Sequence, residues 1–264
     1  MIKINNGINT FLDAAGKTLE TAPKLYDDLV QPAAKQLGKT LELIPRSINA
    51  ALSPAWNWVM HREYNVAETE KLLSEKLKNV DPNKIVQPEA YVAVPALQAI
   101  SYSMDNAVLR NLYANLIAKS MNIDTKDNVH PSFVEIIKQL SPLDAKLFDI
   151  LCMNATNPII DLVLNEKNKG GSIQLINNIT NISISTTESL SVSINNLERL
   201  KLISIPYAAY YTDNNLYTPF YEHDIYKQYK EMYSESDSYE LDITKKIISI
   251  TDMGKSFHKI CVSN

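Results

Sequence analysis

The sequence predicts a mainly α-helical chain with a C-terminal α+β domain of the winged helix-turn-helix type. Three observations support this fold class. Apolar residues in the first half recur at intervals of three and four, the spacing of one helix face. Ser141, Pro142 and Asp144 form a helix start close to a capping box. The second half then reads helix, helix, helix, strand, strand, which is the element order of a winged helix.

An amphipathic helical region is predicted for residues 1–61. From Leu25 to Leu52 a single apolar stripe advances in helical steps. Pro32 and Pro45 each remove a backbone donor and disfavour helical geometry in the preceding residue. We therefore expect two or three short helices here rather than one rod.

Trp56 and Trp58 follow this stripe, within an uncharged stretch at residues 47–60. The stretch is shorter than the ~20 residues that a membrane-spanning helix needs. Packing in a core or between subunits is the favoured interpretation, and a helix lying on the membrane surface is the alternative.

A helical core is predicted for residues 62–141. Its helices are expected at 66–78, at 94–121 with a break near Met104 and Asp105, and at 131–140. Pro95 is expected in the first turn of the second helix, where its missing N–H has no intrahelical partner to lose.

A winged-helix-like domain is predicted for residues 142–264. Helices are expected at 143–153, 172–178 and 187–201, strands at 202–205 and 246–250, and a short terminal helix at 251–257. The third helix takes the place of the recognition helix of a winged helix.

The predicted wing between the two strands, residues 206–242, holds nine of the fourteen tyrosines. Loops longer than about 12–15 residues usually carry function or are disordered. Residues 224–233 are expected to form a short helix within this Tyr-rich wing.

Three stretches carry a family resemblance: residues 130–142 (HPSFVEIIKQLSP), 26–38 (YDDLVQPAAKQLG) and 110–118 (RNLYANLIA). They resemble motifs of the bacterial Abi-alpha (abortive infection alpha) family. The resemblance implies a role in phage defence, in which an infected cell stops growing or dies before virions are released. It implies no catalytic residues, and the long Tyr-rich wing departs from the family pattern.

The charge balance offers little attraction for nucleic acid. The chain has 26 Lys and Arg against 30 Asp and Glu, a formal net charge of −4, and affinity for DNA depends largely on neutralised phosphates. Asn195 and Arg199 of the predicted third helix suit contact with a protein better than contact with DNA. Nucleic acid is therefore not an expected partner.

No residue pattern predicts an active site. His130 precedes an expected helix start, where a structural role is favoured over acid–base chemistry. Residues 61–63 (HRE) lack the second His of a zinc-binding helix, and His223 and His258 stand alone. The six glycines show no phosphate-loop spacing. We expect no enzyme activity, no metal and no cofactor.

The expected function is defence through protein association, including self-association, and contact with a membrane surface is left open. A DNA-binding winged-helix regulator is the alternative, and an enzyme with an unrecognised site comes third. The predicted partner-binding residues are Trp56, Trp58, Asn195, Arg199, Tyr210 and Tyr217. Cys152 and Cys261 are expected to be plain thiols of a reducing compartment. We expect a cytoplasmic protein, and leave open a peripheral position at the inner membrane.

Overall fold

The computed structural model describes residues 48, 50–51, 66–103, 105–168 and 170–263. The helices of its first half are α3 (Val66–Leu77), α4 (Ala90–Ser101), α5 (Ala107–Ser120) and α6 (Ser132–Lys138), with 3-10 turns η1 (Pro82–Lys84) and η2 (Lys126–Asn128). Those of the second half are α7 (Pro142–Met153), α8 (Thr187–Arg199), α9 (Asp224–Met232) and α10 (Asp252–Phe257), with 3-10 turns η3 (Asn214–Leu216) and η4 (Thr218–Glu222) and the π-helix η5 (His258–Val262). The strands are β1 (Pro158–Glu166), β2 (Ser172–Ile179), β3 (Ile203–Ser204), β4 (Tyr239–Ile247) and β5 (Ser249–Ile250).

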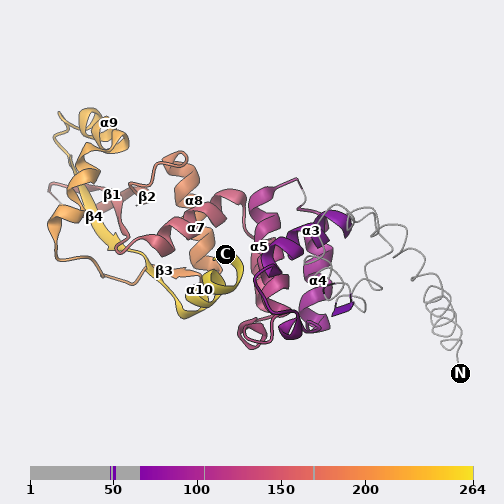
Figure 1. The fold of residues 1–264 in the computed structure, drawn as a ribbon. Coiled ribbons are helices and arrows are strands. Elements are labelled where there is room, and N and C mark those ends of the chain that lie inside the picture. Colours follow the sequence, from indigo (N-terminus) through magenta and orange to yellow (C-terminus); the bar gives the residue numbers. More distant parts are fainter. Residues whose placement is uncertain (1–47, 49, 52–65, 104, 169, 264) are drawn as a thin grey trace, which may run out of the picture.

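Helix-rich and sheet-containing parts occupy opposite ends of the described molecule. Figure 1 shows α3, α4 and α5 at one end, the strands β1, β2 and β4 with α9 at the other, and α7, α8 and α10 between them. The protein is thus a mixed α/β structure, mainly helical, with a small antiparallel sheet of three strands.

The helices predicted within residues 62–141 are confirmed as α3, α4, α5 and α6. The break expected near Met104 separates α4 from α5, and the side chain of Asn106 caps α5 by accepting hydrogen bonds from the backbone N–H groups of Val108 and Leu109. One detail was wrong: Pro95 lies inside α4, which begins at Ala90. The helix starts earlier than predicted because the apolar face already begins with the buried Val92.

The helix start predicted at Ser141 is also confirmed. The Oγ of Ser141 accepts from the backbone N–H of Asp144 at 3.0 Å, and the Oδ2 of Asp144 accepts from the backbone N–H of Ser141 at 2.7 Å. This reciprocal pair is a complete capping box, with Pro142 in the first turn. It fixes the sharp passage from α6 into α7.

The second half departs from the winged-helix prediction. Residues 172–178, expected to be the second helix, form strand β2, which pairs antiparallel with β1. A helix-turn-helix is therefore not confirmed. The two strands expected to flank the wing do pair, through Ile203 with Ile250 and Ser204 with Ser249, and the short helix expected at 224–233 is α9.

The three-stranded sheet has the order β2-β1-β4, so β1 is its central strand. Alternate side chains of a strand face opposite sides of its sheet. Ile160 and Leu162 of β1 pack into an apolar cluster with Tyr217, Phe220 and Tyr226 of the Tyr-rich wing. The wing is therefore a layer packed on one face of the sheet, and α8 lies against β2 on the other side.

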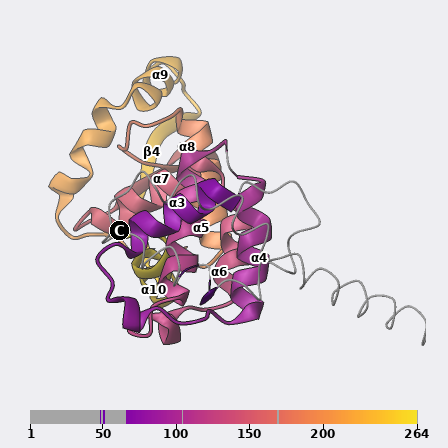
Figure 2. The same ribbon diagram turned by 45° about the vertical axis from the view of Figure 1, so that its right-hand side comes forward.

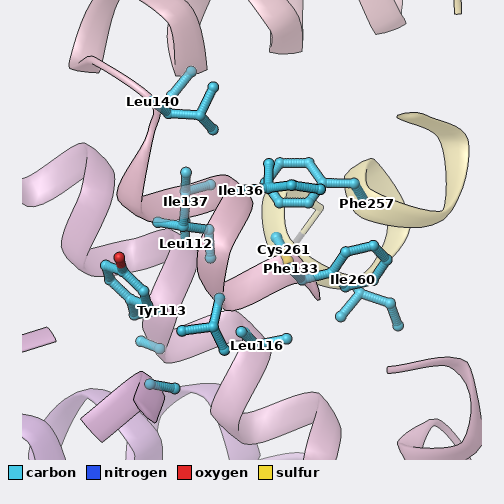
Figure 3. Packing of buried hydrophobic residues seen from close by; sticks show 14 of the residues in the cluster. Leu112, Tyr113, Leu116, Phe133, Ile136, Ile137, Leu140, Phe257, Ile260 and Cys261 are labelled. Atoms are coloured by element: carbon cyan, nitrogen blue, oxygen red, sulfur yellow. The ribbon is translucent and has the colours of Figure 1, made fainter. Parts of the chain in front are cut away.

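A larger apolar cluster joins the two halves of the chain. The Phe133 ring of α6 meets the Phe257 ring of α10 edge to face, with centroids 5.4 Å apart. Nearby, Asn115 of α5 donates from Nδ2 to the carbonyl of Cys261 at 2.8 Å. Figure 3 shows Phe133, Phe257 and Cys261 close to α5, and in Figure 2 α10 lies beside α6. Residues 252–262 thus complete the core of the helical half.

Most of the predicted N-terminal region, including Trp56 and Trp58, lies outside the described residues. Ile48 of the predicted apolar stripe is helical and only 1% exposed, and it belongs to the larger cluster. This residue therefore packs in the core, as the favoured interpretation of the stripe predicts.

Candidate partner-binding surface

The Tyr-rich wing buries some of its tyrosines and exposes others. Tyr217 is fully buried, and its hydroxyl donates to the carbonyl of Lys246 at 3.0 Å and accepts from the backbone N–H of Tyr211 at 3.0 Å. Burial raises the pKa of Tyr217, so its hydroxyl keeps the proton that it donates. Tyr217 was predicted to contact a partner, but its place is in the core.

Tyr207 and Tyr210 lie on the surface, in the loop that follows β3. The Tyr207 side chain is fully exposed and Tyr210 is 57% exposed. The loop is anchored on both sides, because Ile205 donates its backbone N–H to Glu198 of α8 and the Tyr211 hydroxyl accepts from the backbone N–H of Asn157. Two aromatic side chains are thus presented to solvent from a tethered segment.

Asn195 and Arg199, the predicted contacts on α8, are exposed but engaged. Asn195 accepts from the side chain of Asn178 at 2.8 Å. Arg199 donates to Gln139 at 2.9 Å and to Asn196 at 2.7 Å. These bonds tie α8 to β2 and to the α6–α7 junction, so the Arg199 guanidinium is already used within the chain.

Beneath α8 a buried polar network holds the sheet together. The Asp161 carboxylate accepts from Lys246 Nζ at 2.7 Å, from the backbone N–H of Asn178 at 2.9 Å and from Gln174 at 2.9 Å. Lys246 also donates to the Asn178 side chain at 2.6 Å, and Asn178 donates to Asn195. The network joins β1, β2, β4 and α8, and it places one predicted site residue, Asn195, at its edge.

His130 and His223 take structural positions at helix starts. His130 Nδ1 accepts from the backbone N–H of Ser132 at 3.1 Å at the start of α6, in agreement with its predicted role. His223 Nδ1 accepts from the backbone N–H of Ile225 at 3.3 Å and so caps α9.

His258 lies between a carboxylate and a hydroxyl. Its Nε2 is 3.1 Å from Asp149 Oδ1, and its Nδ1 is 3.1 Å from Ser263 Oγ. The three residue types are those of a hydrolase triad, but Ser263 also donates its backbone N–H to the carbonyl of His258 and so ends η5. The arrangement ties the end of η5 to α7. Sequence reasoning missed it because His258 and Asp149 are 109 residues apart.

A cavity of about 360 Å³ lies between the loop before α8 and the start of α9. Its lining residues include Ser183, Ser185 and Thr186, together with the acidic residues Glu188 and Asp224. The starts of two helices favour an anion, whereas the two carboxylates oppose one. The cavity therefore has no clear preference for ligand charge.

The two cysteines are free thiols. Burial, with a smaller effect from Asp149, raises the pKa of Cys152 to about 12, and burial also raises the pKa of Cys261. Because the thiolate is the nucleophile, we expect Cys152 in the folded protein at pH 8 to be alkylated by iodoacetamide about a thousandfold more slowly than an exposed cysteine. Mass spectrometry of timed samples would measure the rate. Denaturant should abolish the protection, and rapid labelling of the folded protein would contradict the prediction.

Within the described ranges, no three His, Cys, Asp or Glu side chains form a group that could hold a metal ion. The described helices also include none that is long and apolar enough to cross a membrane.

A family model described as Abortive infection alpha matches residues 61–261. The match runs from the helical half through the sheet and the Tyr-rich wing to η5. No curated protein and no solved structure matches the chain.

Proposed function

Because the chain belongs to the abortive infection alpha family, we propose that it is a bacterial phage-defence protein that acts by binding other proteins, including further copies of itself, without catalysis. In such a system an infected cell stops growing or dies before new virions are released. The family match supports the biological role. The exposed surface and the contacts of the polar side chains support the mode of action.

The observation that carries the binding mechanism is the exposed pair Tyr207 and Tyr210. Tyrosine is enriched at protein interfaces because its ring buries a large apolar area while its hydroxyl forms hydrogen bonds. The loop is tethered to α8 and to Asn157, so little conformational freedom is lost when a partner binds. This surface is the proposed protein-binding site.

Non-enzymatic action is supported by the contacts that the more reactive side chains make. These side chains are a carboxylate, a histidine and the two thiols. The Asp161 carboxylate joins three strands, and His258 links η5 to α7. The thiols of Cys152 and Cys261 are held in their protonated form by burial. These groups stabilise the fold, and each is satisfied by neighbours within the chain or buried.

We place the protein in the cytoplasm in this proposal, because free thiols suit a reducing compartment. The N-terminal region is the only part proposed to contact the inner membrane, because Trp56 and Trp58 follow its apolar stripe.

The test is a phage plaque assay on cells producing the double variant Tyr207→Ser/Tyr210→Ser. We expect protection to fall at least about tenfold, because removal of an interface hot spot, a class in which tyrosine is enriched, costs about 2 kcal/mol of binding free energy or more. The matched control is Tyr91→Ser/Tyr102→Ser, which removes Tyr91 of α4 and Tyr102 directly after its last residue; these side chains are 62% and 71% exposed.

The control should keep full protection, and both double variants should accumulate and melt like the wild type. Equal protection by the two double variants would contradict the proposed site. If the wild-type chain gives no protection against a broad panel of phages, the defence role itself is wrong.

A further inference from the structure

Strand β2 forms one outer edge of the three-stranded sheet. Glu166 donates its backbone N–H to the carbonyl of Gly171 at 2.7 Å at the turn between β1 and β2. Because backbone groups alternate in direction along an antiparallel strand, those of Ser172 and Gln174 then point away from β1. None of the described strands pairs with this outer edge.

The open part of the edge is its first half. Ser172, Ile173 and Gln174 are exposed, whereas Asn178 and Ile179 at the other end are buried. The buried end is the part near α8, because Asn178 donates to Asn195 there. Residues 172–175 thus present an accessible strand edge beside a sheet that is otherwise covered on one face by the Tyr-rich wing.

The two edges of the sheet differ in protection against pairing. Strand β4, at the opposite edge, carries four charged side chains: Glu240, Asp242, Lys245 and Lys246. Such charges are a common defence against unwanted edge pairing. Strand β2 has the sequence SIQLINNI, without a charge or a proline, and it lies in a segment, residues 170–187, that contains no charged residue. Of the two edge strands of the described three-stranded sheet, β2 is therefore the one without charged side chains to oppose pairing with another strand.

We propose that the outer edge of β2 pairs with the same edge of a second copy of this chain. The two strands run antiparallel about a twofold axis near Gln174, and the two three-stranded sheets become one sheet of six strands. This inference rests on the proposed function, because it names the partner and the surface for self-association.

A second copy fits this edge better than an unrelated strand. Side chains that face their own copies across a twofold axis repel each other if they are charged, and β2 has none. Because the Gln174 side chain already donates to Asp161, the hydrogen bonds between two copies come from the outward-pointing backbone N–H and C=O groups of the edge. An uncharged edge also offers no charge pattern by which a different chain would be selected. High β-propensity, amide side chains and low charge are the signature of segments that pair with themselves.

The first test compares Ile173→Lys with Ile123→Lys in the full chain. Both isoleucines are 49% exposed, but Ile123 lies in the helical half. Sedimentation velocity over a range of concentrations should show the wild type and Ile123→Lys reaching twice the monomer mass. Ile173→Lys should need at least about tenfold more protein, because a lysine on the edge strand brings like charges together at the axis.

Ser172→Pro provides an independent variant. It removes an N–H that points outward, so the pairing of β2 with β1 keeps its hydrogen bonds while the intermolecular edge loses one. We expect a monomer with an unchanged melting temperature. A wild-type chain that stays monomeric at every concentration would overturn the proposal, as would dimers of unchanged strength in both edge variants.

The mass measurement is independent of phage protection, so the two ideas fail separately. Loss of the dimer in Ile173→Lys with full protection against phage would leave the edge contact established and remove its link to defence. Loss of protection in the tyrosine variant with an unchanged dimer would support two separate surfaces. A mass of one copy plus a smaller co-purified peptide would overturn the choice of partner.

Discussion

Replacing Gly254 with alanine is expected to lower the free energy of unfolding by about 3 kcal/mol or more. A Cβ at this position would overlap the carbonyl oxygen of Leu202, and it would lie 3.1 Å from Cγ2 of Ile250. The carbonyl that would have to move is that of Leu202, directly before β3, and it accepts from the backbone N–H of Thr251, directly after β5. The strain would push α10 away from β3 and withdraw Phe257 from the core.

Urea denaturation followed by circular dichroism would measure this effect. The control is Gly171→Ala, whose new Cβ would meet only the flexible Glu166 side chain, at 3.3 Å. That variant should change the free energy of unfolding by less than about 1 kcal/mol. Equal midpoints for the two variants would show that the close approach of α10 to β3 is not a constraint.

Lys246→Met is expected to lower the free energy of unfolding by about 3 kcal/mol, because it leaves the Asp161 carboxylate buried without its cation. The Asp161 side chain is only 8% exposed and the Lys246 side chain 20%, and their ion pair is 2.7 Å long. Two hydrogen bonds, from Gln174 and from the backbone of Asn178, would remain on the carboxylate. They satisfy its oxygens without compensating its charge.

The neighbouring lysine of β4 provides a matched control. Lys245 donates to the exposed Asn214 at 2.7 Å and its Nζ lies 5.5 Å from the centre of the Tyr217 ring. Lys245→Met removes the same charge and the same hydrogen-bonding group on the other face of the strand, and should cost no more than about 1 kcal/mol. Chemical denaturation of both variants gives the comparison. If Lys246→Met lowers the free energy of unfolding no more than the control does, the ion pair of Asp161 with Lys246 contributes little to stability.

The helical half followed closely from the sequence because its signals are local. The break before Asn106 and the capping box at Ser141 each depend on residues within four positions of one another. Such patterns are visible without knowledge of the tertiary structure. The position of Pro95 was misjudged only because α4 starts four residues earlier than expected.

The sheet was missed for a physical reason. Strand β1 is buried on both faces, so it lacks the alternation of polar and apolar residues that marks a half-buried strand. Strand β2 pairs with β1 through two register irregularities, and these also blur its periodicity. Its apolar positions Ile173 and Ile176 are also compatible with a helical step, and residues 172–178 were wrongly predicted to be a helix.

The candidate site was predicted in part. Tyr210 and Asn195 are on the surface as expected, but Tyr217 is in the core because the wing folds back over the sheet. Composition identified the segment and gave no information on which tyrosine faces inward. The contacts of His258 with Asp149 and of Arg199 with Gln139 join residues 60 or more positions apart. No local sequence pattern predicts such contacts.

The packing of η5 against α5 has a consequence for synthesis. Asn115 and its partner Cys261 are separated by 146 residues, which a bacterial ribosome adds in about 7 to 30 seconds at about 5–20 residues per second. During that interval the nascent helical half has an unfilled apolar groove where Phe257 and Ile260 will lie. A prematurely terminated chain would keep this groove open and become a substrate for chaperones and proteases. Only chains that include residues 252–262 would then accumulate.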